Sequence, residues 1–271
     1  MQPDEFQYIS NLLKDQSGIA LTEDKIYLLE SRLQPLARQH GLETVSDLIG
    51  RMRSVRDPKL EHEVVQSMTT NETMFFRDNK PFDNLKNKIL PHMREQQASR
   101  KHLRIWSAAC SSGQEPYTIG MCLQEEMMRM SGYSYEIVAT DLCEKVVDKA
   151  KQGLYTQFEV QRGLPIQLLL KYFQQAPENQ WRVSDTLKQM IKFNTQNLMA
   201  DYGKLGSFDI IFCRNVLIYF DEKTKTQVLD KLASALTPPG FLVLGSAETV
   251  IGLTDRFQAF EGEPGIYTLK Q

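Results

Sequence analysis

The pattern of hydrophobic and polar positions divides the chain into two parts. Up to about residue 68, apolar residues recur three and four positions apart, as at Phe6, Ile9 and Leu13, which is typical of amphipathic helices. Four helices are expected: one that ends before Gly18, one from about residue 22 to Gly41, one over 45–52 and one over 60–68. We therefore predict a small all-α N-terminal domain over residues 1–68.

From residue 103 onward, apolar runs alternate with helical segments. Runs that predict strands occur at 103–109, 135–140, 191–194, 208–213 and 241–245, with helices expected at about 116–130, 144–152 and 222–236. The run at 208–213 is almost entirely apolar, as a central parallel strand should be. Two final runs, 257–260 and 265–269, indicate a closing antiparallel hairpin. The pattern predicts an α/β fold with a doubly wound, Rossmann-like sheet and a closing antiparallel strand.

Residues 153–190 break this alternation. The stretches 153–155, 164–173 and 181–183 indicate a helical segment and a short hairpin. We therefore expect a small β-hairpin insertion between the second and third main strands.

The first strand leads into a turn of small residues, 107–113, and then into a helix that begins near Pro116. Small side chains let the backbone approach a ligand, and the free N–H groups of the first helical turn point toward it. The turn has one glycine where a dinucleotide fingerprint has three. Taken alone, it is compatible either with a ligand site or with an ordinary strand-to-helix connection.

Asp141 directly follows the second strand, about thirty residues after the turn. Ligands of doubly wound sheets bind outside the carboxyl ends of the strands, where an acidic residue accepts hydrogen bonds from ribose hydroxyls. Asp141 could instead cap the helix expected at 144–152. We favour the ribose role because the strand ends immediately before this residue.

Composition limits the possible partners. The chain has 271 residues, 41% hydrophobic and 24% charged, with a net charge of −2. Phosphate binding needs a basic surplus, so we expect no nucleic-acid partner. No apolar run approaches the roughly 18 residues that span a bilayer, and the acidic start does not resemble a signal peptide. We therefore expect no membrane insertion and a cytoplasmic location.

The cysteines and histidines offer little catalytic chemistry. The four cysteines are widely separated, and we expect reduced core thiols, with Cys110 and Cys213 as candidates to line a site. All four histidines lie at or before His102, and no spacing suits a metal. We predict no metal site and no histidine base in the second half.

Two further stretches each leave two interpretations. Basic residues of the helical part are either solvated surface or a docking face for an acidic helical partner. The polar and aromatic segment 69–80 is either a linker or a lid on the cofactor turn that directs Arg77 into the site.

Several motifs in one order resemble the chemotaxis receptor methyltransferase (CheR) family. They are residues 69–77, the stretch from Trp106 to Tyr117, Ala139-Thr140-Asp141, Asn197-Leu198, and the stretch from Phe212 to Phe220. The resemblance covers nearly the whole chain. It implies a methyltransferase that takes a methyl group from S-adenosylmethionine, leaves S-adenosylhomocysteine, and converts glutamate side chains of chemoreceptors to methyl esters. It also implies a domain map: receptor docking in 1–68, an interdomain segment 69–80 that contributes to the site, and a methyltransferase domain 81–271 with the insertion at about 153–190.

The resemblance implies a set of cofactor-binding residues. Glu115 would bind the cationic methionine amino group, Asp141 the ribose, and Asn197 with Leu198 the adenine. The complete expected set is Asn71, Thr73, Arg77, Ala108, Glu115, Asp141, Leu142, Asn197, Leu198, Arg214 and Asn215. Gln114 stands where the family often has a second acid, which leaves the cofactor assignment intact.

By the same resemblance, Arg77 and Tyr219 would be the catalytic residues. A glutamate acceptor has a pKa of about 4.3 and is already an anion at neutral pH, so the reaction needs no histidine base. We expect Arg77 to orient the acceptor carboxylate and the Tyr219 hydroxyl to bond one of its oxygens. Arg77 could instead bind cofactor alone, and Tyr219 could be a buried aromatic.

The expected partner is the cytoplasmic helical region of chemoreceptors. Arg32, Arg38 and Arg53 would meet its acidic face, and we expect the protein to be a monomer. Family members that bind a receptor C-terminal pentapeptide have a longer, glycine-containing loop where this chain has the shorter 172–181. We therefore predict activity without that tether. Two other classes stay open: a methyltransferase that acts on nitrogen, and a catalytically silent binding module.

Overall fold

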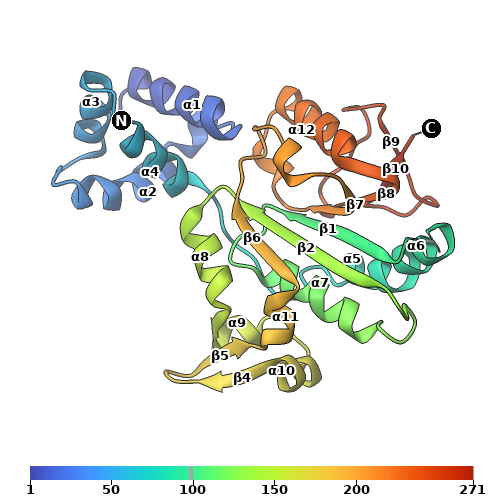
Figure 1. Cartoon of the computed structure of the whole chain (residues 1–271). Helices are drawn as coiled ribbons and strands as arrows, with labels where there is room; N and C mark the ends of the chain where they lie inside the picture. The colour runs from blue at the N-terminus through green and yellow to red at the C-terminus, as the bar shows by residue number, and fades with distance from the viewer. Residues whose placement is uncertain (98–99, 271) are drawn as a thin grey trace. The chain divides into compact units, whose positions relative to one another are not determined.

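The N-terminal helices form the first of two units in this computed structural model, which describes residues 1–97 and 100–270 (Figure 1). This unit comprises Met1–Thr70 and also Tyr219–Thr224, and the second comprises Asn71–Ile218 and Lys225–Gln271. The four predicted helices of the first unit are confirmed. They are α1 (Pro3–Ser17), α2 (Ile26–Gln39), preceded by the 3₁₀ turn η1 (Glu23–Lys25), α3 (Val45–Ser54) and α4 (Pro58–Met68). Gly18 ends α1 in a left-handed conformation, with φ 78°.

The segment Tyr219–Thr224 is held to the helical unit by main-chain and charged contacts. The N–H of Ala20 donates to the carbonyl of Tyr219 (2.9 Å), and Ile19 and Phe220 form an isolated antiparallel bridge. The Lys14 ammonium donates to the Asp221 carboxylate and to the Thr224 hydroxyl. The sequence pattern gave no sign of these contacts.

A seven-stranded sheet forms the centre of the second unit. Its order is β6-β2-β1-β7-β8-β10-β9, with bounds β1 (His102–Ala108), β2 (Ser134–Asp141), β6 (Ile191–Thr195), β7 (Phe208–Cys213), β8 (Leu236–Leu244), β9 (Phe257–Ala259) and β10 (Ile266–Leu269). The pairs β1–β2, β1–β7, β2–β6 and β7–β8 are parallel. Strand β10 is antiparallel to both of its neighbours. The predicted fold class is confirmed, and strand order reverses between β1 and β7, where such sheets bind ligands.

Helices cover both sides of this sheet, and Figure 1 shows α7 and α12 on opposite sides of it. They are α5 (Lys80–Asn84), α6 (Leu90–Gln96), α7 (Gln114–Glu125), α8 (Glu144–Gln152) and α12 (Glu222–Ala235), with the π-helix η2 (Leu85–Ile89) between α5 and α6. Helix α7 begins near Pro116 as predicted, two residues before it, but the predicted end at residue 130 is wrong because the helix ends at Glu125. Pro116 lies in the first turn, where a helix does not use its N–H groups, so it does not mark the start.

The insertion is a three-stranded antiparallel sheet of order β3-β5-β4. The predicted hairpin has one strand more than expected, because β5 (Gln180–Val183) pairs with both β4 (Phe173–Ala176) and β3 (Leu154–Thr156). Strand β3 has only three residues and one buried side chain, Tyr155, so it carries no readable alternation. The helices α9 (Gln157–Gln161), α10 (Ile166–Tyr172) and α11 (Asp185–Gln189) complete this part.

The main core lies on one face of the large sheet. Ile105, Ile137 and Ile210 belong to a buried cluster that includes apolar residues of α7 and both Phe75 and Phe82. Trp106 is adjacent to Ile105 in β1, so its side chain lies on the opposite face, where it contacts Tyr202 with ring centroids 4.8 Å apart. Burial on both faces fixes the strands and therefore the positions of the loops at their carboxyl ends.

No helix within the described residues is long and apolar enough to cross a membrane. The same residues contain no group of three or more His, Cys, Asp or Glu side chains that could hold a metal ion.

Candidate functional site

The turn after β1 has an unusual backbone. Ala109 and Ser111 have φ angles of 57° and 50°, although neither is glycine. Gly113 has a φ of 94°, and a Cβ there would lie 2.8 Å from Cβ of Ala150 and 3.0 Å from the Tyr155 hydroxyl oxygen. Non-glycine residues in the left-handed region cost free energy and concentrate at functional sites. This geometry favours a ligand site over an ordinary connection.

Asp141, the last residue of β2, is joined to this turn. Its carboxylate accepts hydrogen bonds from the N–H groups of Ser111 (2.8 Å) and Cys143 (2.9 Å). The bond to Cys143, the N-cap residue of α8, closes a turn before the helix and is not a side-chain cap, and the bond to Ser111 connects Asp141 to the turn after β1. Burial raises the pKa of Asp141 above its ordinary value, although the amides of Cys143, Ser111 and Leu142 lower it.

A buried ion pair joins the start of α7 to the end of β7. Arg214 donates through Nη1 to Oε2 of Glu115 (2.8 Å), and the other carboxylate oxygen of Glu115 accepts from the Ser107 hydroxyl (2.8 Å). Through Nη2, Arg214 donates to the Asp78 carboxylate and to the carbonyl of Arg77, both at 2.8 Å. The Arg214 side chain is only 1% exposed and that of Glu115 12%, so the bond between them is shielded from water, whereas the Asp78 side chain is 39% exposed.

One donor of this buried arginine has no partner. Among the described residues, nothing accepts a hydrogen bond from Nε of Arg214. An unsatisfied buried donor costs free energy, and more when it belongs to a charged group. A polar group of a ligand would satisfy it, which makes this atom a candidate ligand contact.

The segment before α5 is built into the second unit. Phe75 and Phe76 are buried, and the carbonyl of Asn71 accepts from the Ser111 hydroxyl (2.7 Å). The residues on both sides of Arg77 have positive φ angles, 52° at Phe76 and 68° at Asp78. Arg77 itself is half-buried and donates to the carbonyl of Glu72 (3.0 Å). Thr73 lies in the same half-buried stretch.

Asn197 and Leu198 follow β6, the neighbour of β2. The N–H of Gln196 donates to the carbonyl of Asp141 (2.9 Å), so the two predicted ribose and adenine positions lie at adjacent strand ends. Asn197 accepts from the N–H of Met199 (2.8 Å), and the Tyr202 hydroxyl donates to the carbonyl of Leu198 (2.6 Å). These bonds fix the conformation of the loop.

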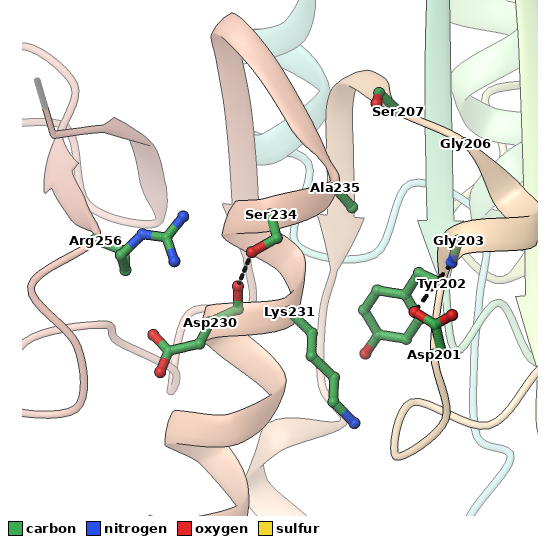
Figure 2. Close-up of a pocket in the computed structure, with 10 residues that line it drawn as sticks. All are labelled: Asp201, Tyr202, Gly203, Gly206, Ser207, Asp230, Lys231, Ser234, Ala235 and Arg256. Atoms are coloured by element: carbon green, nitrogen blue, oxygen red, sulfur yellow. Dashed lines mark hydrogen bonds between the residues drawn. The ribbon is translucent and has the colours of Figure 1, made fainter.

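Figure 2 shows a cavity beside this loop, with Lys231 extending from α12 and Tyr202 on the facing loop. Lys231 donates to the carbonyl of Met199, which ties α12 to the loop. The cavity has a volume of about 420 Å³ and is lined by both acids and bases, among them Asp230 and Arg256. None of the site residues predicted from the sequence lines it in the described chain, so it is distinct from the site at the strand ends.

The loop after Arg214 reveals a residue that the sequence reasoning missed. Glu248 follows β8, and its carboxylate accepts hydrogen bonds from the N–H groups of Asn215, Val216, Leu217 and Gly245. The only signal in the sequence was an acid soon after a fully apolar strand. Asp78 and Glu248 also border a cavity of about 610 Å³, whose apolar lining includes Leu244 and Ile251.

Tyr219 ends the 3₁₀ turn η4 (Leu217–Tyr219) and belongs to the first unit. Its side chain is partly exposed, which does not fit the alternative of a buried core aromatic. Its main chain is fixed by the bond from Ala20 described above.

The three predicted docking arginines differ in their surroundings. Arg32 donates to the carbonyls of Met68 and Thr69 and to the Thr70 hydroxyl, so its guanidinium holds the end of α4. Arg53 pairs with Asp4 (2.8 Å) and lies over the ring of Tyr8, but remains partly exposed. Arg38 is exposed.

All four cysteines are free and buried. Burial raises the pKa of Cys110 well above its usual value, and the carboxylates of Asp141 and Glu115 raise it further. Burial does the same to the pKa of Cys213, with Glu248 and Glu115 adding to it. Both thiols therefore stay protonated and are not nucleophiles.

Two family models match nearly the whole chain. The model described as "CheR methyltransferase, all-alpha domain" matches residues 4–69, and "CheR methyltransferase, SAM binding domain" matches residues 71–266. A chemotaxis protein methyltransferase of Vibrio parahaemolyticus is 42% identical over 98% of this chain and 97% of that protein. One of Pseudomonas putida is 40% identical over 97% of this chain and 96% of that protein.

Among solved structures, a magnesium protoporphyrin IX methyltransferase of Synechocystis with bound SAM is 17% identical and covers 83% of this chain and 76% of that chain. Its TM-score is 0.36, which is too low to carry an argument.

Proposed function

The chain belongs to the CheR methyltransferase family, and we propose that it methylates glutamate side chains of chemoreceptors to give glutamyl methyl esters. Family membership makes it an S-adenosylmethionine-dependent methyltransferase, whereas the glutamate acceptor is our proposal. The observation that carries the proposal is the buried Arg214, which pairs with Glu115 and Asp78 and has an unpartnered Nε, beside the constrained turn after β1.

The residues at the strand ends fit the cofactor. The Glu115 side chain is 12% exposed and would bind the cationic amino group by its charge, while Asp141, whose carboxylate bonds the turn at Ser111, would accept hydrogen bonds from ribose hydroxyls. Asn197 and Leu198 would contact the adenine. We assign the remaining contacts to the other residues of the predicted set, namely Asn71, Thr73, Arg77, Ala108, Leu142, Arg214 and Asn215. When bound, S-adenosylmethionine supplies an electrophilic methyl group on a sulfonium, and S-adenosylhomocysteine remains after the transfer.

The chain itself has to orient the acceptor and exclude water. The acceptor carboxylate is ionised at neutral pH, so the protein needs no general base. Arg77 would hold one carboxylate oxygen by a charge-assisted hydrogen bond, and the Tyr219 hydroxyl would bond the other. Aligning an acceptor with the methyl group in this way supplies about 7–11 kcal/mol in favourable cases.

Methyl transfer to receptor-containing membranes tests this function. We expect radiolabel from S-adenosylmethionine to enter the receptor and to leave as volatile methanol after mild alkali, because esters hydrolyse under those conditions. Base-stable label would instead indicate methylation of nitrogen. Absence of label from a chain that binds cofactor would indicate a silent binding module. Arg77→Ala and Tyr219→Phe should each reduce the rate of labelling, because each removes a group that would orient the acceptor carboxylate.

Receptor recognition would use the helical unit. Arg38 and Arg53 are exposed or partly exposed and could meet acidic side chains of the helical cytoplasmic region, whereas Arg32 is engaged by the end of α4. Because that region lies in the cytoplasm, we place the enzyme there and propose that it acts as a monomer. Arg38→Glu should raise KM for receptor membranes at low salt and leave kcat unchanged. Arg256→Glu, in the second unit, is the matched control.

We also propose that the enzyme works without a pentapeptide tether. The connection between β4 and β5 has only three residues, of which Glu178 and Asn179 have positive φ angles. A turn this tight differs from the longer loop of family members that bind the pentapeptide. Isothermal titration with a receptor C-terminal pentapeptide should give no heat of binding, and micromolar affinity would refute this part alone.

A further inference from the structure

Glu248 is a buried carboxylate that the proposed mechanism does not use. It lies three residues after Gly245, in the loop that follows β8, and is 9% exposed. Its Oε1 accepts from the N–H groups of Val216 (2.9 Å) and Leu217 (2.8 Å). Its Oε2 accepts from those of Asn215 (2.8 Å) and Gly245 (2.8 Å). All four donors are backbone amides, and both oxygens are used twice.

Three of these donors are consecutive in the chain. Asn215 has a φ of 57°, and this left-handed residue turns the amides of 215, 216 and 217 toward one point. Successive N–H groups arranged in this way make a concave site for an anion. Here the anion is the side chain of Glu248, so the loop after β7 is shaped around a carboxylate from another loop.

The three amides bonded to Glu248 lie between two residues that have roles in the proposed function, Arg214 before them and Tyr219 after them. Arg214, immediately before the first bonded amide, makes the buried pair with Glu115. Leu217, the third bonded amide, begins the 3₁₀ turn that ends at Tyr219. The direction in which the chain leaves β7 therefore depends on the four bonds to Glu248.

Gly245 leaves room for this arrangement. A Cβ at this position would lie 2.7 Å from Oε2 of Glu248 and 3.0 Å from the backbone nitrogen of Asn215. Any side chain there would push the carboxylate away from Asn215. The close approach of the Gly245 backbone to Glu248 and Asn215 therefore depends on the conformation of both the loop after β7 and the loop after β8.

From this geometry we propose that Glu248 is a positioning residue for methyl transfer. By fixing the amides of Asn215, Val216 and Leu217, it sets the placement of Arg214 for cofactor binding and the direction in which the chain leaves β7. The inference rests on the proposed function, because its effect on catalysis passes through residues assigned there. It also predicts a local structural effect that does not depend on activity.

Glu248→Gln is the informative change because it preserves size. An amide has one acceptor oxygen, so in either orientation two of the four N–H groups lose their acceptor and face an NH₂ group instead. We expect kcat per folded molecule to fall by roughly tenfold or more and the affinity for S-adenosylhomocysteine to fall as well, with KM for receptor membranes unchanged. Glu263→Gln, which alters a carboxylate of the same unit that is 24% exposed and pairs with Lys88 and Lys80, should change none of these quantities.

Gly245→Ala provides a second test if Glu248→Gln folds poorly. It retains the Glu248 carboxylate but displaces it, so kcat should fall as in Glu248→Gln. Amide hydrogen exchange should become faster at 215–217 in both variants, while β7 stays protected. These exchange rates and the affinity for S-adenosylhomocysteine can be measured even if the wild-type enzyme labels no receptor, which separates this inference from the proposed function. Unchanged kcat, affinity and exchange in folded Glu248→Gln would overturn it, as would a loss of stability alone.

Discussion

The chain between Arg214 and Thr224 is fixed at its two ends by charges in opposite environments. At the first end, in the second unit, Arg214 is 1% exposed and is surrounded by Glu115, Asp78 and main-chain oxygen. At the second end, in the first unit, Lys14 pairs with Asp221, and these side chains are 31% and 46% exposed. Water screens the second pair and competes with it, whereas it hardly reaches the first. Loss of an ion pair should therefore change the free energy of unfolding much more at Arg214 than at Lys14.

The largest effect is expected from Arg214→Met. Removing one partner of a buried ion pair leaves uncompensated carboxylates, which typically lowers the free energy of unfolding by about 3–5 kcal/mol. Binding of S-adenosylhomocysteine should be lost at the same time. Urea unfolding and isothermal titration measure the two effects.

Arg100→Met is the control for Arg214→Met. Arg100 pairs with Asp209, which is fully buried in β7, so its removal should also destabilise the protein. Asp209 lies near the start of the strand rather than at its carboxyl end, so affinity for S-adenosylhomocysteine should not change. If Arg214→Met has the stability of the wild type and its affinity for S-adenosylhomocysteine, the contacts of Arg214 contribute to neither.

Glu115→Gln should come next in size and separates charge from shape. The amide can still accept from the Ser107 hydroxyl, but it carries no charge to bind a cationic amino group. Affinity for S-adenosylhomocysteine should fall by about tenfold to hundredfold, because a hydrogen bond to a charged group contributes about 1.5–3 kcal/mol. In Glu136→Gln, which changes a β2 carboxylate bonded to Arg104 and Lys192, affinity should stay the same. Equal affinities in both variants would argue against the assigned role of Glu115.

Tyr219→Phe tests the residue that lies between the two ends. Only the hydroxyl is removed, so we expect kcat for receptor methylation to fall by about tenfold or more, with unchanged affinity for S-adenosylhomocysteine and unchanged stability. Tyr27→Phe is a suitable control, because Tyr27 is 70% exposed on α2. A variant with full kcat would leave Arg77 alone to orient the acceptor.

The sequence predicted the parts of the site that depend on local pattern. The constrained turn and Asp141 each follow an apolar run directly, so the run that predicts a strand also locates the strand end. Helix α7 begins two residues before Pro116, because proline is tolerated throughout the first turn rather than only at its start.

The parts that were missed depend on contacts between distant residues. Glu248 bonds amides 31 to 33 positions earlier in the chain, and Arg214 meets Glu115 across 99 positions. Periodicity tells which face of an element is buried, but it does not tell which distant group a buried charge will meet. Lys14 and Asp221 are a further case, since each looks like an ordinary surface residue in the sequence.

Lys14→Met should have the smallest effect and shows how the exposed end differs. The Lys14 ammonium and the N–H of Thr224 hold the pKa of Asp221 well below its usual range. A lowered carboxyl pKa stabilises the folded state above the unfolded-state pKa of about 3.9, and this contribution is lost as the pH falls toward the folded-state pKa. For an exposed pair it amounts to less than about 1 kcal/mol at pH 7.

Urea unfolding of Lys14→Met and wild type at pH 7 and pH 3 measures this contribution. The difference in the free energy of unfolding should be small at pH 7 and smaller at pH 3, and added salt should reduce it at pH 7. A difference that persists at pH 3 would mean that Lys14 stabilises the segment through its hydrocarbon chain rather than its charge. If Lys14→Met lowered the free energy of unfolding as much as Arg214→Met does, the contrast between the two ends would be removed. Solvent exposure would then not determine how much an ion pair stabilises this protein.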